Sequence, residues 1–227
     1  MGYEEKKKYA FKGGGIVPCP YAAHRMCIDL IDTGKTVLDV GCATGYLSAK
    51  LREKGCRVIG LEVDPEMAGI AKANCDEVVC GNAEVIELPF KDYFEVVLYA
   101  DVLEHLRNPL EVLTRFKKYL KKGGCIVISI PNVANWFVRF SLMFGNFNYS
   151  SKGCAILDSG HLRFFTLKTI REIIERAGFQ ITFLDITVDL PGSSRFPFIR
   201  AIAKFWKELF AVQFIIKAGS KNESQTV

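Results

Sequence analysis

TVLDVGCATG, from Thr36 to Gly45, is the stretch that decides the fold of this chain. Its apolar first half predicts a buried strand, and the glycines after it predict a turn into a helix over residues 46–54. A second apolar run, residues 57–61, predicts a strand that ends on Glu62. This order predicts a nucleotide-binding unit, because the glycine turn lets the backbone approach a ligand and the acid can accept hydrogen bonds from both ribose hydroxyls.

The spacing of the glycines indicates which nucleotide the turn suits. A dinucleotide fold requires G-x-G-x-x-G, so that a pyrophosphate rests on a helix N-terminus. Here Gly41 and Gly45 flank Ala43, which does not match that spacing. The sequence also lacks the G-x-x-x-x-G-K-[ST] pattern of a P-loop. The turn therefore argues against both phosphate-binding loops.

The pattern D-x-G-x-x-x-G, with Asp39 inside the strand, resembles the first motif of class I S-adenosylmethionine-dependent methyltransferases. That family's usual form is D-x-G-C-G-x-G, and this chain has Ala43 in place of the middle glycine. Because an alanine disfavours positive φ, we expect this replacement to lower the affinity for the cofactor.

Three further motifs extend the resemblance over about residues 20–217. GNAE, residues 81–84, follows a strand predicted over residues 77–80 and is similar to the family's G-D-A-E segment, with Asn82 in place of the aspartate. YFEVVLYADVLEHL, residues 93–106, is similar to the motif after the fourth strand. DSGHLRFFT, residues 158–166, resembles a subgroup with quinone, lipid and glycan-linked acceptors. Several motifs in this order are far more specific than any one of them.

The alternation of strands and helices predicts the architecture. The 227 residues fit one α/β domain with a doubly wound, Rossmann-like, mostly parallel sheet. We predict a helix over residues 110–120, a turn at 122–124, and strands over 125–130, 180–185 and 211–217 that complete seven strands. The resemblance implies that the last strand is antiparallel. We expect a single domain over residues 1–227, with a core at about 20–217 and small helical lid or acceptor insertions at about 132–165 and 191–210.

The resemblance implies that S-adenosyl-L-methionine binds over the carboxyl ends of the first, second and fourth strands. Asp39 would order the glycine turn and face the methionine end of the cofactor, and Glu62 would accept both ribose hydroxyls. The other implied contacts come from the glycine turn, from the ends of the second and third strands beside the adenine, and from the end of the fourth strand. They are Gly41, Cys42, Ala43, Gly45, Val63, Asn82, Ala83, Ala100 and Asp101.

Catalysis in this family consists mainly of aligning the acceptor with the methyl–sulfur bond. A hydroxyl acceptor benefits from a general base, and His161 is our candidate for a base or an acceptor-orienting group. The alternative is that His161 is a structural histidine that fixes its loop.

Asp101, Glu104 and His105 are spaced so that a helix beginning at Asp101 would place them on one face. Ubiquinone-pathway methyltransferases have a similar E-x-x-E-H divalent-metal site, with a glutamate where this chain has Asp101. These three residues are therefore weak metal candidates, and we predict no metal. The alternative role for Asp101 is to cap the helix.

The segment 132–165 is rich in aromatic residues, which suits either a lid over an apolar or ring-shaped small-molecule acceptor or a subdomain that buries its own core. We predict methyl transfer to a small molecule, with oxygen slightly favoured as the acceptor atom. The alternatives are a membrane-surface lipid or quinone methyltransferase, a non-catalytic cofactor-binding protein and a nicotinamide-dependent oxidoreductase.

The net charge and the cysteine pattern indicate which partners and which cellular compartment suit this chain. The formal net charge is +5, and residues 195–221 alone carry six basic residues against Glu208. Residues 195–210 are also aromatic, so this segment either packs on the domain or touches an anionic membrane. Nucleic acid is a poor fit, because no basic stripe continues elsewhere. Eight cysteines without C-x-x-C, and no apolar signal core, predict a cytoplasmic protein.

Overall fold

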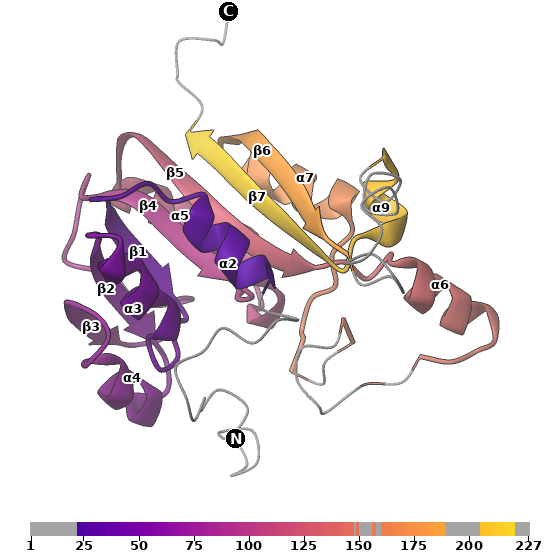
Figure 1. The fold of residues 1–227 in the computed structure, drawn as a ribbon, viewed down its shortest axis with the longest axis horizontal. Helices are drawn as coiled ribbons and strands as arrows, with labels where there is room; N and C mark the ends of the chain where they lie inside the picture. The colour runs from indigo at the N-terminus through magenta and orange to yellow at the C-terminus, as the bar shows by residue number, and fades with distance from the viewer. Residues whose placement is uncertain (1–21, 148, 150–155, 158–159, 189–204, 221–227) are drawn as a thin grey trace, which may run out of the picture.

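The computed structural model describes residues 22–147, 149, 156–157, 160–188 and 205–220, and its centre is a seven-stranded sheet (Figure 1). The strand order is β3-β2-β1-β4-β5-β7-β6. Strands β1 to β5 pair in parallel, whereas β7 runs antiparallel to both β5 and β6. The doubly wound prediction with an antiparallel last strand is therefore confirmed. The strands are β1 Thr36–Val40, β2 Arg57–Glu62, β3 Glu77–Cys80, β4 Phe94–Ala100, β5 Leu120–Pro131, β6 Phe179–Thr187 and β7 Gln213–Ser220.

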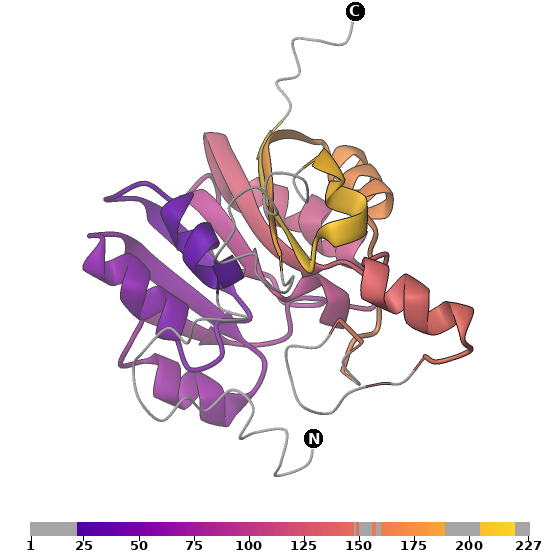
Figure 2. The ribbon, with the colours of Figure 1, turned by 45° about the vertical axis from the view of Figure 1, so that its right-hand side comes forward.

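Helices cover both faces of the sheet, as Figures 1 and 2 show. Side chains alternate along β1, so Val37 packs with α2 and α3, whereas Leu38 and Val40 belong to the core that includes α5 and α7. The helices are α2 Ala22–Asp29, α3 Tyr46–Glu53, α4 Pro65–Ala71, α5 Pro109–Phe116, α6 Trp136–Met143, α7 Leu167–Arg176 and α9 Lys207–Phe210, with 3₁₀ turns η1 Leu103–His105 and η2 Lys117–Tyr119.

No helix begins at Asp101, so the condition for a common face of Asp101, Glu104 and His105 is not met. Asp101 has a φ of +54°, which lies in the left-handed region and cannot begin a right-handed helix. Only the turn η1 follows, and α5 then begins anew with Asn108 as its N-cap and Pro109 in its first turn. Asp101 is consequently not on a common helical face with Glu104 and His105.

Strand β5 is longer than the sequence predicted. We expected a turn at residues 122–124 and a strand from Cys125, but β5 already begins at Leu120. The pairing register between β4 and β5 shifts between Phe94 and Val96, and Gly123 has a φ of +78°. The two glycines therefore form an irregularity inside the strand rather than a turn before it.

Candidate active site

A cavity of about 400 Å³ lies at the carboxyl ends of β1 to β4. This is where open α/β sheets bind ligands, because the connections diverge there. The cavity is lined by the glycine turn, the end of β2, the loop after β3 and the segment after β4. Its walls include seven of the predicted cofactor residues: Gly41, Ala43, Glu62, Val63, Asn82, Ala83 and Asp101.

Four predicted cofactor residues are not among the residues that line the cavity. Asp39 is 1% exposed, and its Oδ2 accepts a hydrogen bond from Ser48 Oγ at 2.6 Å. Cys42 is buried with Ala71 and Cys75. Gly45 caps α3 with a φ of +77°, and Ala100 packs in the core cluster that includes α2. Cofactor contacts from these four residues therefore stay a prediction.

The Glu62 carboxylate ties the end of β2 to the glycine turn. Its Oε2 accepts from the backbone N–H of Ala43 at 2.8 Å, and its Oε1 accepts from Val63 and Asp64 at 2.8 and 2.9 Å. Glu62 is 8% exposed and lines the cavity. Three of the roughly four lone-pair directions of a carboxylate are thus used on backbone donors. If a ribose diol donates two hydrogen bonds to this carboxylate, one of them has to go to a lone pair that already accepts from a backbone N–H group.

Asn82 and its neighbours form a hydrogen-bonded loop in the cavity wall, next to the end of β2. Asn82 Oδ1 accepts from the Glu84 N–H at 2.8 Å. The Glu84 carboxylate in turn accepts from the backbone of Arg107 and Asn108 at 2.8 and 3.0 Å. The loop after β3 is therefore anchored to the start of α5, which fixes this part of the cavity wall.

Asp101 is the centre of a polar network that sequence reasoning missed. Its Oδ2 lies 2.9 Å from His24 Nε2, and its Oδ1 accepts from Ser129 Oγ and Gln213 Nε2, both at 2.8 Å. The Tyr46 hydroxyl lies 2.5 Å from His24 Nδ1. Burial raises the pKa of Asp101, but the hydrogen bonds from His24, Ser129 and Gln213 outweigh it and hold the pKa below its usual value. Asp101 is thus a fixed carboxylate at the cavity wall.

The weak metal candidates Asp101, Glu104 and His105 are not brought together, because the Asp101 carboxylate is bonded to His24, Ser129 and Gln213. His161 takes its place: among the described residues, Glu104, His105 and His161 offer ligand atoms that lie within 4.8 Å of one another. The His161 side chain is only 7% exposed, and it is its neighbour Gly160 that lines the cavity. His161 therefore lies behind the cavity wall.

Ala43 has a φ of +49°, the conformation that the family's usual glycine adopts without strain. We predict that the Ala43→Gly variant unfolds at the same temperature as wild type or at a higher one. The Ala43→Val variant should unfold at a clearly lower temperature than wild type. The left-handed region costs an alanine ~1–2 kcal/mol, partly offset by the greater entropy of an unfolded glycine, and a β-branched residue fits it worst. Each kcal/mol shifts the midpoint by roughly 2–4 °C. A thermal melt in which the valine variant matches wild type would contradict this reading.

The buried Asp39 gives a prediction for pH dependence. Burial raises its pKa to about 6, against an opposing hydrogen bond from Ser48. Because the folded pKa is raised, its contribution to stability is fully present below about pH 4 and is lost as the pH rises through about 6. Asp39→Asn should therefore be more stable than wild type by up to ~3 kcal/mol at pH 7, at 1.36 kcal/mol per pKa unit. Urea unfolding at pH 4 and pH 7 measures this difference, and an equal difference at both would contradict it.

Comparison with known proteins gives the family. A family model described as a methyltransferase domain matches residues 21–183, more than half of the chain. The chain therefore belongs to the class I S-adenosylmethionine-dependent methyltransferases, and its cofactor is S-adenosyl-L-methionine. The family and cofactor predictions are confirmed.

Individual relatives agree with this assignment. A protein of Mycolicibacterium smegmatis, named as a probable S-adenosylmethionine-dependent methyltransferase, is 27% identical over 65% of this chain and 53% of its own length. A ubiquinone biosynthesis O-methyltransferase of Dechloromonas aromatica is 34% identical over 46% of this chain and 50% of its own. The chain spans about half the length of these curated relatives. An S-adenosylmethionine-dependent methyltransferase structure from Archaeoglobus fulgidus has the same fold, with a TM-score of 0.65 at 19% identity over 96% of this chain and 95% of that one.

Proposed function

We propose that this protein transfers the methyl group of S-adenosyl-L-methionine to an oxygen of a small-molecule acceptor. The observation that supports methyl transfer is the position of Glu62. Its carboxylate lies at the end of β2, is hydrogen-bonded to the glycine turn and lines the cavity. The choice of oxygen is supported by the relative named as a ubiquinone biosynthesis O-methyltransferase.

In the proposed reaction, a lone pair of the acceptor oxygen forms a bond to the sulfonium methyl carbon. The methyl–sulfur bond breaks with its electron pair on sulfur, which gives S-adenosylhomocysteine, and the acceptor's hydroxyl proton is released to water. Alignment of the two reactants can supply ~7–11 kcal/mol of the barrier reduction. The fixed Asp101 carboxylate at the cavity wall favours the positively charged sulfonium.

The test is transfer of a radioactive methyl group from labelled cofactor to panels of hydroxyl, amine and thiol acceptors. We expect label in a hydroxyl product, strongly reduced in Glu62→Gln. Label confined to amines or thiols would overturn the oxygen assignment. A folded protein that binds S-adenosylhomocysteine but labels no acceptor would favour the non-catalytic alternative.

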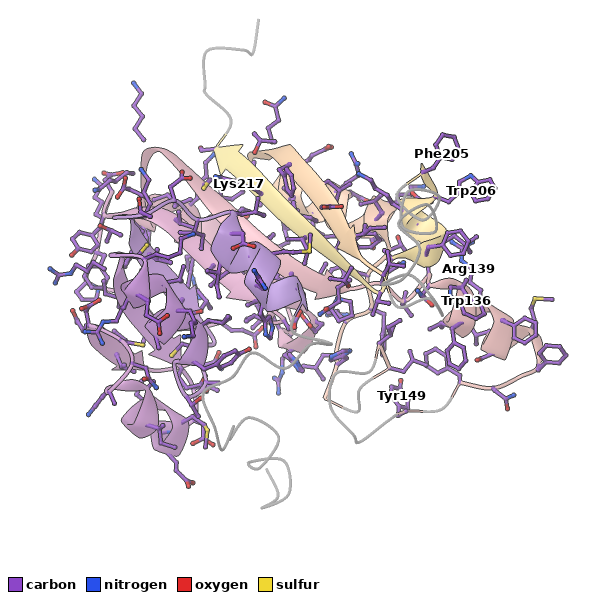
Figure 3. All side chains as sticks on the ribbon, in the orientation of Figure 1. Trp136, Arg139, Tyr149, Phe205, Trp206 and Lys217 are labelled. Atoms are coloured by element: carbon purple, nitrogen blue, oxygen red, sulfur yellow. The ribbon has the colours of Figure 1, made fainter. Side chains whose placement is uncertain are left out.

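We further propose, as a second candidate, that the enzyme works on an anionic membrane surface and takes a lipophilic acceptor. Figures 1 and 2 show α6 extending away from the sheet. Its exposed side chains and those of the segment before α9 are mostly apolar, and α6 carries Arg139 and no acid. Figure 3 shows Trp136, Arg139 and Trp206 on this same side. Large exposed apolar side chains here are Phe137, Phe140, Leu142, Met143, Phe144, Phe205 and Trp206.

Aromatic side chains beside basic ones suit the membrane–water interface. The rest of the basic segment that we singled out, residues 195–204, lies outside the described residues. Within the described part of the chain, no helix is long and apolar enough to cross a membrane.

Vesicle flotation tests this second candidate. We expect binding to vesicles containing anionic phosphatidylglycerol at low salt, lost in the double variant Phe140→Ser, Phe144→Ser. The matched control is Val85→Ser, because Val85 is 73% exposed and follows β3, away from α6. Absence of wild-type binding, or equal loss in the control, would contradict membrane docking. A dimer dispersed by the double variant would assign the surface to a second copy instead.

A further inference from the structure

Two buried thiols share the space beside Gly60, in the middle of β2. A Cβ on Gly60 would lie 2.6 Å from Cys42 Sγ and 3.0 Å from Cys75 Sγ, so the two sulfur atoms fill the volume that the glycine leaves. Cys42 belongs to the glycine turn, and Cys75 follows α4. Each cysteine is 4% exposed, and together with Ala71 they form a small buried cluster. The fold therefore brings together two thiols that lie far apart in the chain.

The two thiols are close enough to hydrogen-bond, and this bond makes them unequal. The bond from the Cys42 thiol stabilises the charged form of Cys75 and holds the pKa of Cys75 below its usual value, against the opposing effect of burial. The same bond raises the pKa of Cys42. Cys75 therefore ionises first, and the thiolate is the form of cysteine that reacts with oxidants.

Cys75 lies in a turn at the surface of the molecule. Residues 72–73 before it and residues 76–77 after it are exposed, so only a thin layer of the protein covers the sulfur. Helix α4, which precedes this turn, has only seven residues. Short surface segments of this kind open locally at a small part of the free energy of global unfolding. Local opening would admit a small oxidant to Cys75.

We propose that Cys42 and Cys75 are an oxidation site, at which a peroxide converts the two thiols into a reversible disulfide. The Cys75 thiolate attacks one peroxide oxygen, the O–O bond breaks, and hydroxide leaves a sulfenic acid on Cys75. The Cys42 sulfur then attacks the Cys75 sulfur, the S–O bond breaks, and the departing oxygen takes the Cys42 proton and leaves as water. Two thiols are oxidised to one disulfide, while one peroxide is reduced to two waters.

The disulfide would act on the cofactor site through the glycine turn. A sulfur–sulfur bond is about 2.05 Å long, shorter than any hydrogen bond between thiols, so it draws Cys42 toward the end of α4. Ala43, the next residue, lines the cavity and donates its N–H to Glu62 Oε2 at 2.8 Å. Because this hydrogen bond to a charged acceptor would lengthen or break, we expect the oxidised protein to bind S-adenosylhomocysteine roughly tenfold more weakly.

Calorimetric titration with S-adenosylhomocysteine tests this proposal on the full-length protein, first reduced, then treated with hydrogen peroxide, and finally reduced again with dithiothreitol. Mass spectrometry of peptides under non-reducing conditions locates the disulfide. We expect the peptides of Cys42 and Cys75 to be linked after peroxide, the affinity to fall about tenfold, and dithiothreitol to restore it. Cys75→Ala should bind like the reduced wild type and should not respond to peroxide.

Cys80→Ala is the matched control, because Cys80 is exposed and its loss should leave the response to peroxide unchanged. Absence of the linked peptides in wild type, or linked peptides with unchanged affinity, would overturn the proposal. So would a loss of affinity that persists in Cys75→Ala or disappears in Cys80→Ala. Thermal melts show whether each variant is folded. The proposal needs only cofactor binding, so a protein that responds to peroxide but methylates no hydroxyl would defeat the proposed function and leave the oxidation site standing.

Discussion

Replacing Glu62 with glutamine is expected to weaken S-adenosylhomocysteine binding by roughly tenfold to a hundredfold, because a charged acceptor contributes ~1.5–3 kcal/mol. The carboxylate holds the Ala43 N–H with one oxygen and the Val63 and Asp64 N–H groups with the other. A glutamine has one acceptor oxygen, and its NH₂ group would face a backbone donor. The variant therefore loses both a ribose acceptor and part of the support for the glycine turn. Calorimetric titration measures the affinity.

The matched control for this experiment is Glu53→Gln at the end of α3. Glu53 is exposed, and among the described residues its carboxylate accepts only from Lys50 in the same helix, so its replacement should leave binding unchanged. Unchanged affinity in Glu62→Gln would remove Glu62 from the cofactor site. A loss of affinity that appears only together with unfolding would restrict its role to support of the turn.

Asp101→Asn is expected to lower stability by ~2–4 kcal/mol and the thermal midpoint by roughly 4–16 °C. Asparagine tolerates the left-handed backbone as well as aspartate does, so the backbone is not the variable. What changes is that three donors, from His24, Ser129 and Gln213, face a single acceptor oxygen. The loss of the carboxylate should also weaken binding of the positively charged S-adenosylmethionine more than that of neutral S-adenosylhomocysteine.

The pH dependence of the same variant provides a second measurement. The pKa of Asp101 is lowered in the folded protein, so its contribution to stability is present above about pH 4 and is lost as the pH falls through the folded pKa. The stability gap between wild type and Asp101→Asn should therefore narrow in acid. Ser129→Ala, which removes one donor and leaves the charge, serves as the control with a loss of ~1 kcal/mol. Two results together would contradict this account: a stability difference between wild type and Asp101→Asn that does not change with pH, and an equal loss of affinity for S-adenosylmethionine and S-adenosylhomocysteine.

The sequence was sufficient for the elements that depend on local patterns. The strands before and after the glycine turn and the acid at the end of β2 all lie where apolar runs and turn residues predicted them. The end of β7 was less well placed, because the predicted strand over residues 211–217 is observed over Gln213–Ser220. The periodicity of apolar residues predicts that a strand exists, but it locates the ends of the strand only to within a few residues.

The polar network could not be predicted, because its contacts join residues that are far apart in the chain. His24 and Asp101 are separated by 77 positions, and Asp101 and Gln213 by 112. Such contacts depend on the strand order, which periodicity does not contain. One signal was present in the sequence: Ser129 interrupts the apolar run of β5, and it is fully buried. A polar residue at such a position predicts a buried partner, although not which one.

The position of β7 has a consequence for how the enzyme matures on the ribosome. Gln213, at the start of β7, pairs with Pro131 at the end of β5 and reaches Asp101 beside the cavity. Because β7 lies between β5 and β6, this edge of the sheet cannot assemble until almost the whole described chain has been synthesised. Contacts of such long sequence separation form late. Newly made chains would thus acquire the Gln213 hydrogen bond that holds Asp101 at the cavity wall only at the end of folding, when the last strand enters the sheet.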